Sequence, residues 1–307
     1  LLGVGTEAEF GGSDMGLMAL LLLQRQAACH AAPLPILESL VMAAPLLQAC
    51  GDAALKATWL ADLATGQRIL TCAVYEPGGS VFDGPRCAAH LDGDQWQISG
   101  EKTAVAFAAK AQGYIVLAAT PAGMGLFLVE ADSVVCETQR GTDDAPLAQL
   151  TFTASPAQLV SEDKAVIDAF ERRLHLAFST QLLGLSETAL KLTATYLRER
   201  KQFDVPIGSF QAVSQRVGDA FIALETMRVA LWRAAWLESE GRSSAFAVAS
   251  ARYLASKGAH QVVSAAQHLH GGMGFDRDYP LHRYFLGVKR IEYLEGGTSA
   301  QLQRLGD

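Results

Sequence analysis

Charge is the first thing this 307-residue chain has little of. Only 19% of its residues are Asp, Glu, Lys or Arg, the net charge is -7 at pH 7, and no stretch is rich in lysine and arginine. This balance excludes nucleic acid and anionic membrane surfaces as expected partners. Half of the residues are hydrophobic, which predicts more apolar surface than a monomer should expose, so we expect an oligomer.

Cysteine is also scarce. The five cysteines are odd in number and lack Cys-x-x-Cys spacing: Cys29, Cys50, Cys72, Cys87 and Cys136. This usage is typical of reduced thiols in a cytoplasmic protein rather than of a disulfide framework or a zinc site. His268 and His270 have no nearby carboxylate or third ligand in the sequence, so we expect structural histidines and no metal.

A long apolar run is missing too. Residues 15–23 are apolar, but Gln24 and Arg25 interrupt them well before the ~20 residues that a membrane span requires. We therefore expect a core helix and no membrane span. The chain starts at Leu1 without a basic region or a cleavage signature, so we expect no secretory signal, and a truncated N-terminus stays open.

What the sequence does have is a change of texture along a chain longer than the usual ~100–200 residues of one domain. A helical pattern rich in Leu, Ala and Met is followed by short β-like runs between Gly, Asp and Pro turns, and then by long periodic helices. We predict an α+β fold with three domains: an N-terminal helical domain over 1–69, a middle antiparallel β-domain over 70–160, and a C-terminal four-helix-bundle-like domain over 161–307.

The strands and helix faces are predicted from periodicity. Five short runs predict strands, at 70–75, 95–99, 114–118, 126–130 and 149–153. In the C-terminal part, apolar residues return every three or four positions, which predicts long helices packed in a bundle. Three faces are expected: Leu182, Leu185, Ala189, Leu192 and Tyr196; Phe210, Val213, Val217, Phe221 and Leu224; and Ala247, Ala251, Leu254, Gly258, Val262, Ala265 and Leu269.

Three C-terminal motifs carry the most specific signal. They are residues 200–219, residues 268–275 (His-Leu-His-Gly-Gly-Met-Gly-Phe) and residues 279–283 (Tyr-Pro-Leu-His-Arg). Together with residues 7–12 and 75–80, they resemble the acyl-CoA dehydrogenase family of flavoenzymes. The resemblance implies a helix–sheet–helix fold, FAD as cofactor, an acyl-CoA substrate and an electron-transfer flavoprotein as acceptor. In that family a glutamate removes the α-proton of the acyl-CoA and FAD accepts the β-hydrogen as hydride.

The resemblance also implies which residues contact FAD held mainly by a neighbouring subunit. Arg200 matches the family's arginine, whose guanidinium offers several donors to a pyrophosphate; Phe203 and Gln211 match its phenylalanine and glutamine. Gly271 and Gly272 match a backbone approach to the ADP moiety, where a side chain would obstruct contact.

Each of these residues also has a plainer interpretation. Arg200 is a cation suited to a helix C-terminus, Gln211 a helix cap or surface amide, and Phe203 a core residue. The glycines are equally suited to a plain loop after a helix.

Two positions near these motifs depart from the family. Asp204 replaces the usual glycine, which alters the turn and brings a negative charge toward the phosphates. His268 stands where a glutamine is usual, so a hydrogen bond to the cofactor is changed or lost.

The positions that hold the flavin within the same chain depart further. Tyr75 replaces a threonine, and Ala104 and Ala106 replace a tryptophan and a threonine. Alanine offers neither stacking area nor a hydrogen-bond donor. The loop at 78–80 is one residue short of the family pattern. We therefore predict that this chain's own flavin site is degenerate.

The catalytic base is missing from both positions that the family uses. Gly296 stands at one and Leu174 at the other, and neither side chain can accept a proton. Glu295 is one residue away from the first position and Glu171 about one helical turn from the second, so both are fallback candidates.

Retained contacts to a neighbour's cofactor, with no base, suggest a heteromer. The C-terminal part is similar to the small subunits of the α2β2 acyl-CoA dehydrogenases of bacterial steroid side-chain degradation, and this implies a larger subunit that supplies the base and most of the flavin pocket. Two alternatives stay open. One is a self-sufficient homo-oligomeric dehydrogenase or related flavin oxidase that uses Glu295 or Glu171; the other is a scaffold homologue without a redox role.

Overall fold

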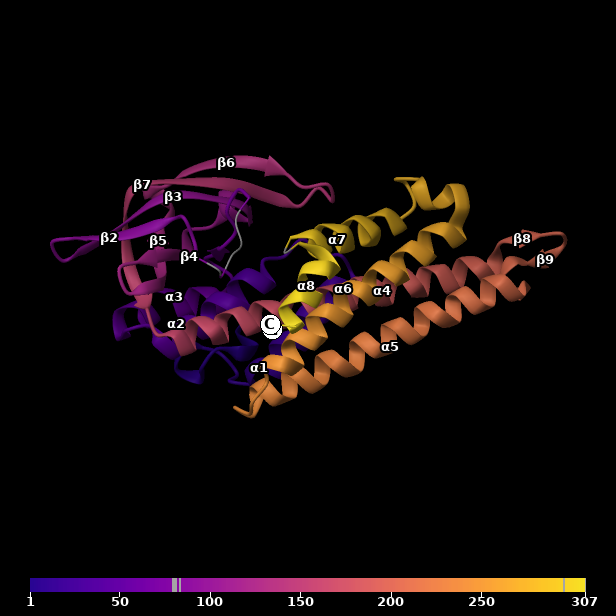
Figure 1. Ribbon diagram of the computed structural model, residues 1–307, viewed down its shortest axis with the longest axis horizontal. Helices are drawn as coiled ribbons and strands as arrows, with labels where there is room; N and C mark the ends of the chain where they lie inside the picture. Colours follow the sequence, from indigo (N-terminus) through magenta and orange to yellow (C-terminus); the bar gives the residue numbers. More distant parts are fainter. Residues whose placement is uncertain (79–81, 83, 295, 307) are drawn as a thin grey trace. The chain divides into compact units, whose positions relative to one another are not determined.

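The computed structural model describes residues 1–78, 82, 84–294 and 296–306 (Figure 1). Contacts group the chain into two compact units. The first unit comprises Leu1–Leu20 and Pro33–Leu174, and the second comprises Leu21–Ala32 and His175–Asp307. Two helices, α1 (Gly16–Cys29) and α4 (Lys164–Glu199), have residues in both units.

The first unit begins with short helices, as the sequence predicts. They are η1 (Leu2–Gly5), η2 (Ala8–Phe10), η3 (Ile36–Ala43), α2 (Ala44–Cys50) and α3 (Ala53–Thr65). The start of α3 is capped by Asp52, whose carboxylate accepts the Leu55 N–H at 2.7 Å, and Gly66 ends the helix in a left-handed conformation.

A seven-stranded sheet follows these helices. Its strands are β1 (Leu70–Ala73), β2 (Ala88–Asp92), β3 (Gln95–Ala106), β4 (Gly113–Thr120), β5 (Gly123–Glu130), β6 (Val135–Arg140) and β7 (Pro146–Ser161), with η4 (Ala108–Lys110) and η5 (Ala131–Ser133) between them. Strands β4, β2, β3, β7 and β5 close into a ring, because β4 pairs with both β2 and β5. The ring is filled by side chains that include Ile98, Val116, Phe127 and Leu150.

All five predicted strands are present, and the helix–sheet–helix order is confirmed. Two strands were missed. β2 is short and contains two alanines, and β6 is a polar, largely exposed edge strand, so neither shows strong β-propensity. The sheet is also mixed rather than purely antiparallel, because β4 runs parallel to β1 and β2. Two parallel strands need a crossover connection between them. The connection from β1 to β4 contains the β2–β3 hairpin.

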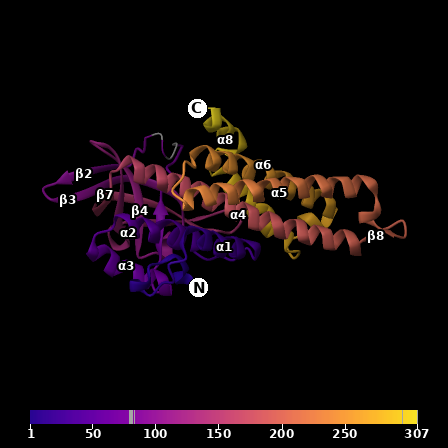
Figure 2. The ribbon, with the colours of Figure 1, turned by 90° about the horizontal axis from the view of Figure 1, so that it is seen from below.

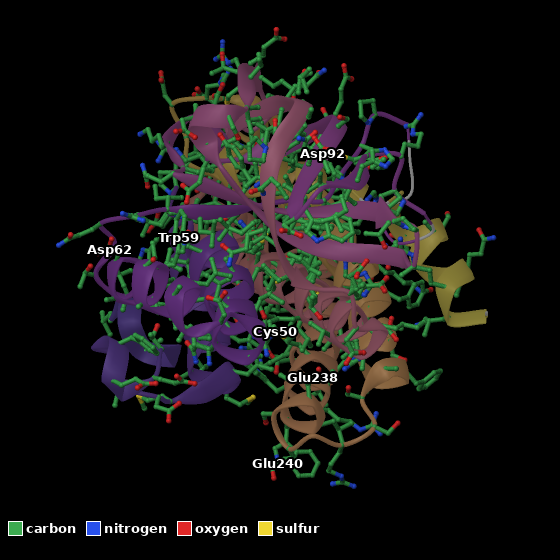
Figure 3. All side chains as sticks on the ribbon, turned by 90° about the vertical axis from the view of Figure 1, so that its left-hand side faces the viewer. Cys50, Trp59, Asp62, Asp92, Glu238 and Glu240 are labelled. Atoms are coloured by element: carbon green, nitrogen blue, oxygen red, sulfur yellow. The ribbon has the colours of Figure 1, made fainter. Side chains whose placement is uncertain are left out.

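A buried tryptophan of helix α3 packs against this sheet. Trp59 is 1% exposed, and a Cβ added at Gly113 of β4 would lie 2.8 Å from its ring. The Arg68 guanidinium lies 5.2 Å from the centroid of the Trp59 ring and forms an ion pair with Asp62 at 3.0 Å. Figure 3 labels Trp59 and Asp62 on this helix. A bulkier residue in place of Gly113 would therefore push helix and strand apart.

The second unit is built from long helices. They are α5 (Gln211–Ser239), α6 (Ala245–His270), α7 (Leu281–Tyr293) and α8 (Gly297–Gly306), with the second half of α4. Helices α5 and α6 lie side by side along much of their length (Figures 1 and 2). Their close approach depends on Gly258, since a Cβ there would lie 2.6 Å from the Met227 side chain.

Two of the predicted helix faces agree with burial and one does not. Leu182, Leu185 and Ala189 of α4 are buried, and so are most members of the α6 face. On α5, however, Phe221 is 54% exposed, and the buried residues are Ala220, Leu224, Met227, Leu231, Ala234 and Ala235. The predicted period is correct, but the buried face is rotated because the alanines rather than the aromatic residues meet the neighbouring helices.

The second half of α1 packs on α4 in this unit. The Gln24 side-chain amide donates to the Ala177 carbonyl at 2.8 Å, and Arg25 forms an ion pair with Glu187 at 2.7 Å. A Cβ at Gly184 would lie 2.6 Å from the Arg25 carbonyl oxygen. Residues 16–23 therefore begin a core helix, as predicted, whereas Met15 lies just before the helix and is exposed. Among the described residues, no helix is both long and apolar enough to cross a membrane.

One ion pair in the sheet unit is fully buried. Lys102 Nζ lies 2.7 Å from Glu76, and its side chain is 0% exposed. The same carboxylate accepts the backbone N–H groups of Arg86 and Cys87 at 2.7 and 3.0 Å. Burial by itself would raise the pKa of Glu76, but the hydrogen bonds from Lys102 and the two N–H groups outweigh it and hold the pKa below its ordinary value.

Replacing Lys102 with Met should lower the free energy of unfolding by about 3–5 kcal/mol, because the Glu76 charge would stay buried without its cation. The control is the double variant Glu76→Gln/Lys102→Met, which removes both charges and should regain most of the loss. Urea denaturation of the three proteins measures both effects. A single variant as stable as the unmodified chain would contradict this account of the pair.

Acid should weaken the same pair. Since the folded-state pKa of Glu76 is depressed, its stabilisation is fully present above the unfolded pKa of about 4.3. It is lost as the pH falls through the folded-state value.

Candidate functional site

The predicted cofactor motif at residues 200–219 begins where α4 ends. The backbone N–H of Arg200 donates to the Tyr196 carbonyl at 2.8 Å, and its own carbonyl accepts the Ile207 N–H at 2.8 Å. A small hairpin follows, formed by β8 (Lys201–Gln202) and β9 (Val205–Pro206), and then η6 (Ile207–Ser209) leads into α5. The Arg200 side chain is exposed, so its position suits both an exposed ligand contact and a cation at a helix C-terminus.

The hairpin turn presents Phe203 to the outside. Phe203 and Asp204 both have positive φ, at 52° and 64°, as a two-residue turn with left-handed residues requires. Phe203 is 88% exposed and touches Phe210 edge-on, with 6.3 Å between the ring centroids. The core interpretation of Phe203 is therefore wrong. Asp204 occupies a left-handed position where glycine would carry less strain.

Gln211 is the first residue of α5, and its side chain is exposed. The N-cap is Phe210, and no side-chain hydrogen bond caps the helix. The capping interpretation of Gln211 is therefore not supported, and its amide faces outward.

The glycine pair follows the last residue of α6 and opens η7 (Gly271–Phe275). Gly271 has φ 57° and ψ -131°, a conformation that is largely confined to glycine. A Cβ at either Gly271 or Gly272 would meet no atom of the chain within 4 Å, so the space beside this backbone is open. His268, one turn earlier, is exposed. An external group can reach both glycines.

These predicted residues gather at one end of the helical unit. Figure 1 shows the β8–β9 hairpin and the turn between α6 and α7 at the same end of the long helices. His270, which the sequence predicts to be a structural histidine, lies here too. The ring of His270 stacks on Tyr196 of α4 at 4.4 Å and is 2% exposed. Its position directly before Gly271 was the available signal.

The positions expected to hold the chain's own flavin lie on β3, and their polar groups are bonded within the chain rather than left open. Ala104 has φ 53°, at a break in the β3–β7 register. Its N–H donates to the Gln139 side chain at 3.1 Å, and the Ala106 carbonyl accepts from the Thr71 hydroxyl at 2.7 Å. These polar groups are satisfied within the chain, and the alanines add no aromatic cover. These residues therefore do not fit a flavin-binding site formed within this chain.

Neither of the two positions that the family uses for its catalytic base carries a carboxylate. Leu174 is 2% exposed in the interior of α4. Gly296 has φ 81°, and a Cβ there would lie 2.8 Å from the Ala300 Cβ. Glu171 is half-buried. Glu295 lies outside the described residues, as do Gly79 and Ser80 of the shortened loop.

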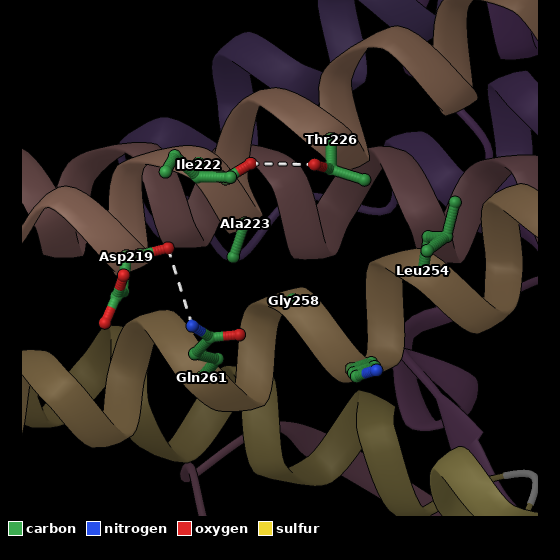
Figure 4. Close-up of a pocket in the computed structure, with 8 residues that line it drawn as sticks. Asp219, Ile222, Ala223, Thr226, Leu254, Gly258 and Gln261 are labelled. Atoms are coloured by element: carbon green, nitrogen blue, oxygen red, sulfur yellow. Dashed lines mark hydrogen bonds between the residues drawn. The ribbon is translucent and has the colours of Figure 1, made fainter.

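No group of three His, Cys, Asp or Glu that could hold a metal occurs among the described residues. A hollow of about 260 Å³ lies between α5 and α6 (Figure 4). It is bordered by Asp219, Ile222 and Gln261, whose amide donates to the Asp219 carbonyl at 3.4 Å. None of the predicted cofactor residues lines it.

Comparison with known proteins establishes the family. Residues 1–67 match the acyl-CoA dehydrogenase N-terminal domain, and residues 170–307 match the acyl-CoA dehydrogenase C-terminal domain. The chain belongs to the acyl-CoA dehydrogenase family, whose members are FAD-dependent oxidoreductases that act on acyl-CoA.

Particular relatives are similar along the whole chain. Acyl-CoA dehydrogenase FadE27 of Mycobacterium tuberculosis is 33% identical, over 100% of this chain and 84% of that protein. Among solved structures, a variant of the Tcur3481–Tcur3483 steroid ACAD is 40% identical, with a TM-score of 0.94 over 100% of this chain and 84% of that one. The ChsE4–ChsE5 complex from Mycobacterium tuberculosis is 33% identical, with a TM-score of 0.93 over 99% and 84%.

Two substitutions at Asp204 test the strained turn. The free energy of unfolding should be about 1 kcal/mol higher for Asp204→Gly than for Asp204→Ala, because only glycine adopts φ 64° without a steric cost. Both variants remove the carboxylate, so charge is matched between them. Thermal unfolding compares the pair, and equal stabilities would contradict strain at this turn.

Restoring a carboxylate at the C-terminal base position should be unfavourable. Gly296→Glu should lose about 1–3 kcal/mol of unfolding free energy, since it combines a left-handed residue with a close contact to Ala300. Gly218→Glu on α5 is the matched control, because a Cβ there meets nothing within 4 Å. Denaturation midpoints should fall for the first variant only.

Proposed function

We propose that this chain is the non-base-bearing subunit of a heteromeric acyl-CoA dehydrogenase and that it completes the FAD site of a larger partner subunit. The reaction of the complex is α,β-dehydrogenation of an acyl-CoA, and we infer a steroid-derived acyl group. An electron-transfer flavoprotein is the proposed acceptor, and the cytoplasm the proposed location. The similarity to a steroid ACAD and to the ChsE4–ChsE5 complex supports this choice.

The observation that carries the proposal is a contrast within one chain. The contacts expected for a neighbour's FAD are exposed and have open space beside them, as at Arg200 and Gly271–Gly272. The positions expected to hold the chain's own flavin carry alanines, and their backbone groups are bonded internally. Leucine and glycine occupy the base positions. A chain so built can bind a cofactor edge but cannot remove an α-proton at these positions.

Each exposed group has a physical role in this proposal. The Arg200 guanidinium donates charge-assisted hydrogen bonds to the pyrophosphate. The Gly271–Gly272 backbone approaches the ADP moiety closely because no Cβ intervenes. Phe203 shields the cofactor from water, and Gln211 offers an amide to it. Bound FAD would supply the hydride acceptor, and a base of the partner subunit would accept the proton.

The experiment compares flavin content of this chain alone and co-expressed with a large acyl-CoA dehydrogenase subunit. We expect little flavin in the isolated chain and a stoichiometric flavin spectrum in the complex. Stoichiometric flavin in the isolated chain would favour the self-sufficient enzyme and direct attention to Glu295 or Glu171. An assembled complex without flavin would favour a scaffold.

Arg200→Ala tests the shared site directly. Losing charge-assisted hydrogen bonds should weaken FAD binding by the complex about 10- to 100-fold, with assembly unchanged by size-exclusion chromatography. Arg233→Ala is the matched control, because Arg233 is an exposed arginine of α5 outside the motif. Equal FAD affinity in the two variants would count against the assignment of Arg200.

A further inference from the structure

A cluster of three aromatic rings joins the two cofactor-contacting elements of the helical unit. His270 is the last residue of α6, Tyr196 lies in the last turn of α4, and Tyr279 lies just before α7. The ring centroids are 4.4 Å apart for Tyr196 and His270, 5.1 Å for His270 and Tyr279, and 6.4 Å for Tyr196 and Tyr279. Tyr196 of α4 thus contacts two rings that lie far from it in sequence.

We propose that His270 is a positioning residue. It holds the Gly271–Gly272 turn at a set distance from Arg200, so that the turn and the arginine can contact the same FAD molecule. This inference rests on the proposed function. No contact between His270 and the cofactor is implied.

The hydrogen bonds of the imidazole define its tautomer and its orientation. Nδ1 lies 2.7 Å from the Ala266 carbonyl, and a carbonyl can only accept, so Nδ1 carries the proton. Nε2, 3.2 Å from the Tyr279 hydroxyl, then accepts from it. With both nitrogens bonded and one face stacked on Tyr196, the ring has no freedom to rotate without losing a contact.

The connection to Arg200 runs through the backbone of α4. Tyr196 supplies the ring on which His270 stacks, and its carbonyl accepts the Arg200 N–H at 2.8 Å. On the other side, His270 is bonded covalently to Gly271. A shift of the imidazole would therefore move the glycine turn relative to Arg200. Displacements of about 1 Å are enough to weaken a binding constellation.

Burial favours the neutral imidazole that this arrangement needs. Burial lowers the pKa of His270, and the hydrogen bond to the Ala266 carbonyl opposes that change only in part. The His270 ring is therefore uncharged at neutral pH.

The test measures FAD binding to the apo complex by quenching of flavin fluorescence, with the partner subunit present throughout. His270→Phe keeps an aromatic ring but removes both hydrogen bonds, and we expect the dissociation constant for FAD to rise about tenfold. His260→Phe is the matched control: it is also a histidine of α6, hydrogen bonded to Glu292 on α7, and it should leave FAD affinity unchanged. Assembly is followed by size-exclusion chromatography.

A double-variant cycle separates positioning from general stability. If His270 acts by setting the distance to Arg200, its substitution should matter much less once Arg200 is already alanine, with an increase in the dissociation constant below about threefold in that background. A purely structural role predicts the same fold-change in both backgrounds, together with a lower melting temperature. Equal fold-changes, or unchanged FAD affinity in His270→Phe, would overturn the proposal.

Tyr279→Phe is a second, milder variant that keeps the test valid if His270→Phe fails to assemble. It removes a single hydroxyl at the rim of the cluster, and we expect an increase of about threefold to fivefold in the dissociation constant. No change in that variant would also overturn the proposal if His270→Phe cannot be prepared. If Arg200→Ala by itself leaves FAD affinity unchanged, the proposed function fails first. If Arg200→Ala weakens binding and the His270 and Tyr279 variants do not, only the positioning role fails.

Discussion

Close packing of the long helices is the constraint on which the candidate site depends. Gly258 lets α6 approach Met227 of α5, and Leu224 and Leu231 of α5 are buried as well. Burying a side chain of this size contributes roughly 1.5–3 kcal/mol. Since α4 and α6 end, and α5 begins, at one end of this unit (Figure 1), their packing brings together motifs that lie far apart in sequence.

The two units differ in how their polar groups are satisfied. In the sheet unit the Glu76 carboxylate is occupied by Lys102 and by two backbone N–H groups, and the Ala104 N–H by Gln139. Glu76, which lies in the motif at residues 75–80, therefore stabilises the sheet. At the end of the helical unit, Arg200 and the glycine pair face open space. This difference fits a chain that contributes contacts to a cofactor rather than a complete pocket.

Much of the fold could be predicted from local patterns. Five strands and the long helices follow from periodicity, and Asp52 and Gly66 delimit α3 through capping. The parallel pairing of β1 with β4 could not be predicted, because it depends on how the ring closes. The buried face of α5 was misplaced for a similar reason: Phe221 has the right spacing, yet Ala220 meets the neighbouring helix. The division into domains at residues 69 and 160 stays a prediction.

For the site, the sequence by itself determined the family. It also predicts that the base is missing at Gly296 and Leu174 and which motif residues contact the cofactor, since these predictions depend on side-chain chemistry at marked positions. Only the tertiary structure decided that Phe203 is exposed rather than in the core, and that His270 joins Tyr196 to Tyr279. The physical reason is that exposure and long-range contacts depend on which helix faces meet. That choice is made by the packing of whole elements rather than by any local pattern.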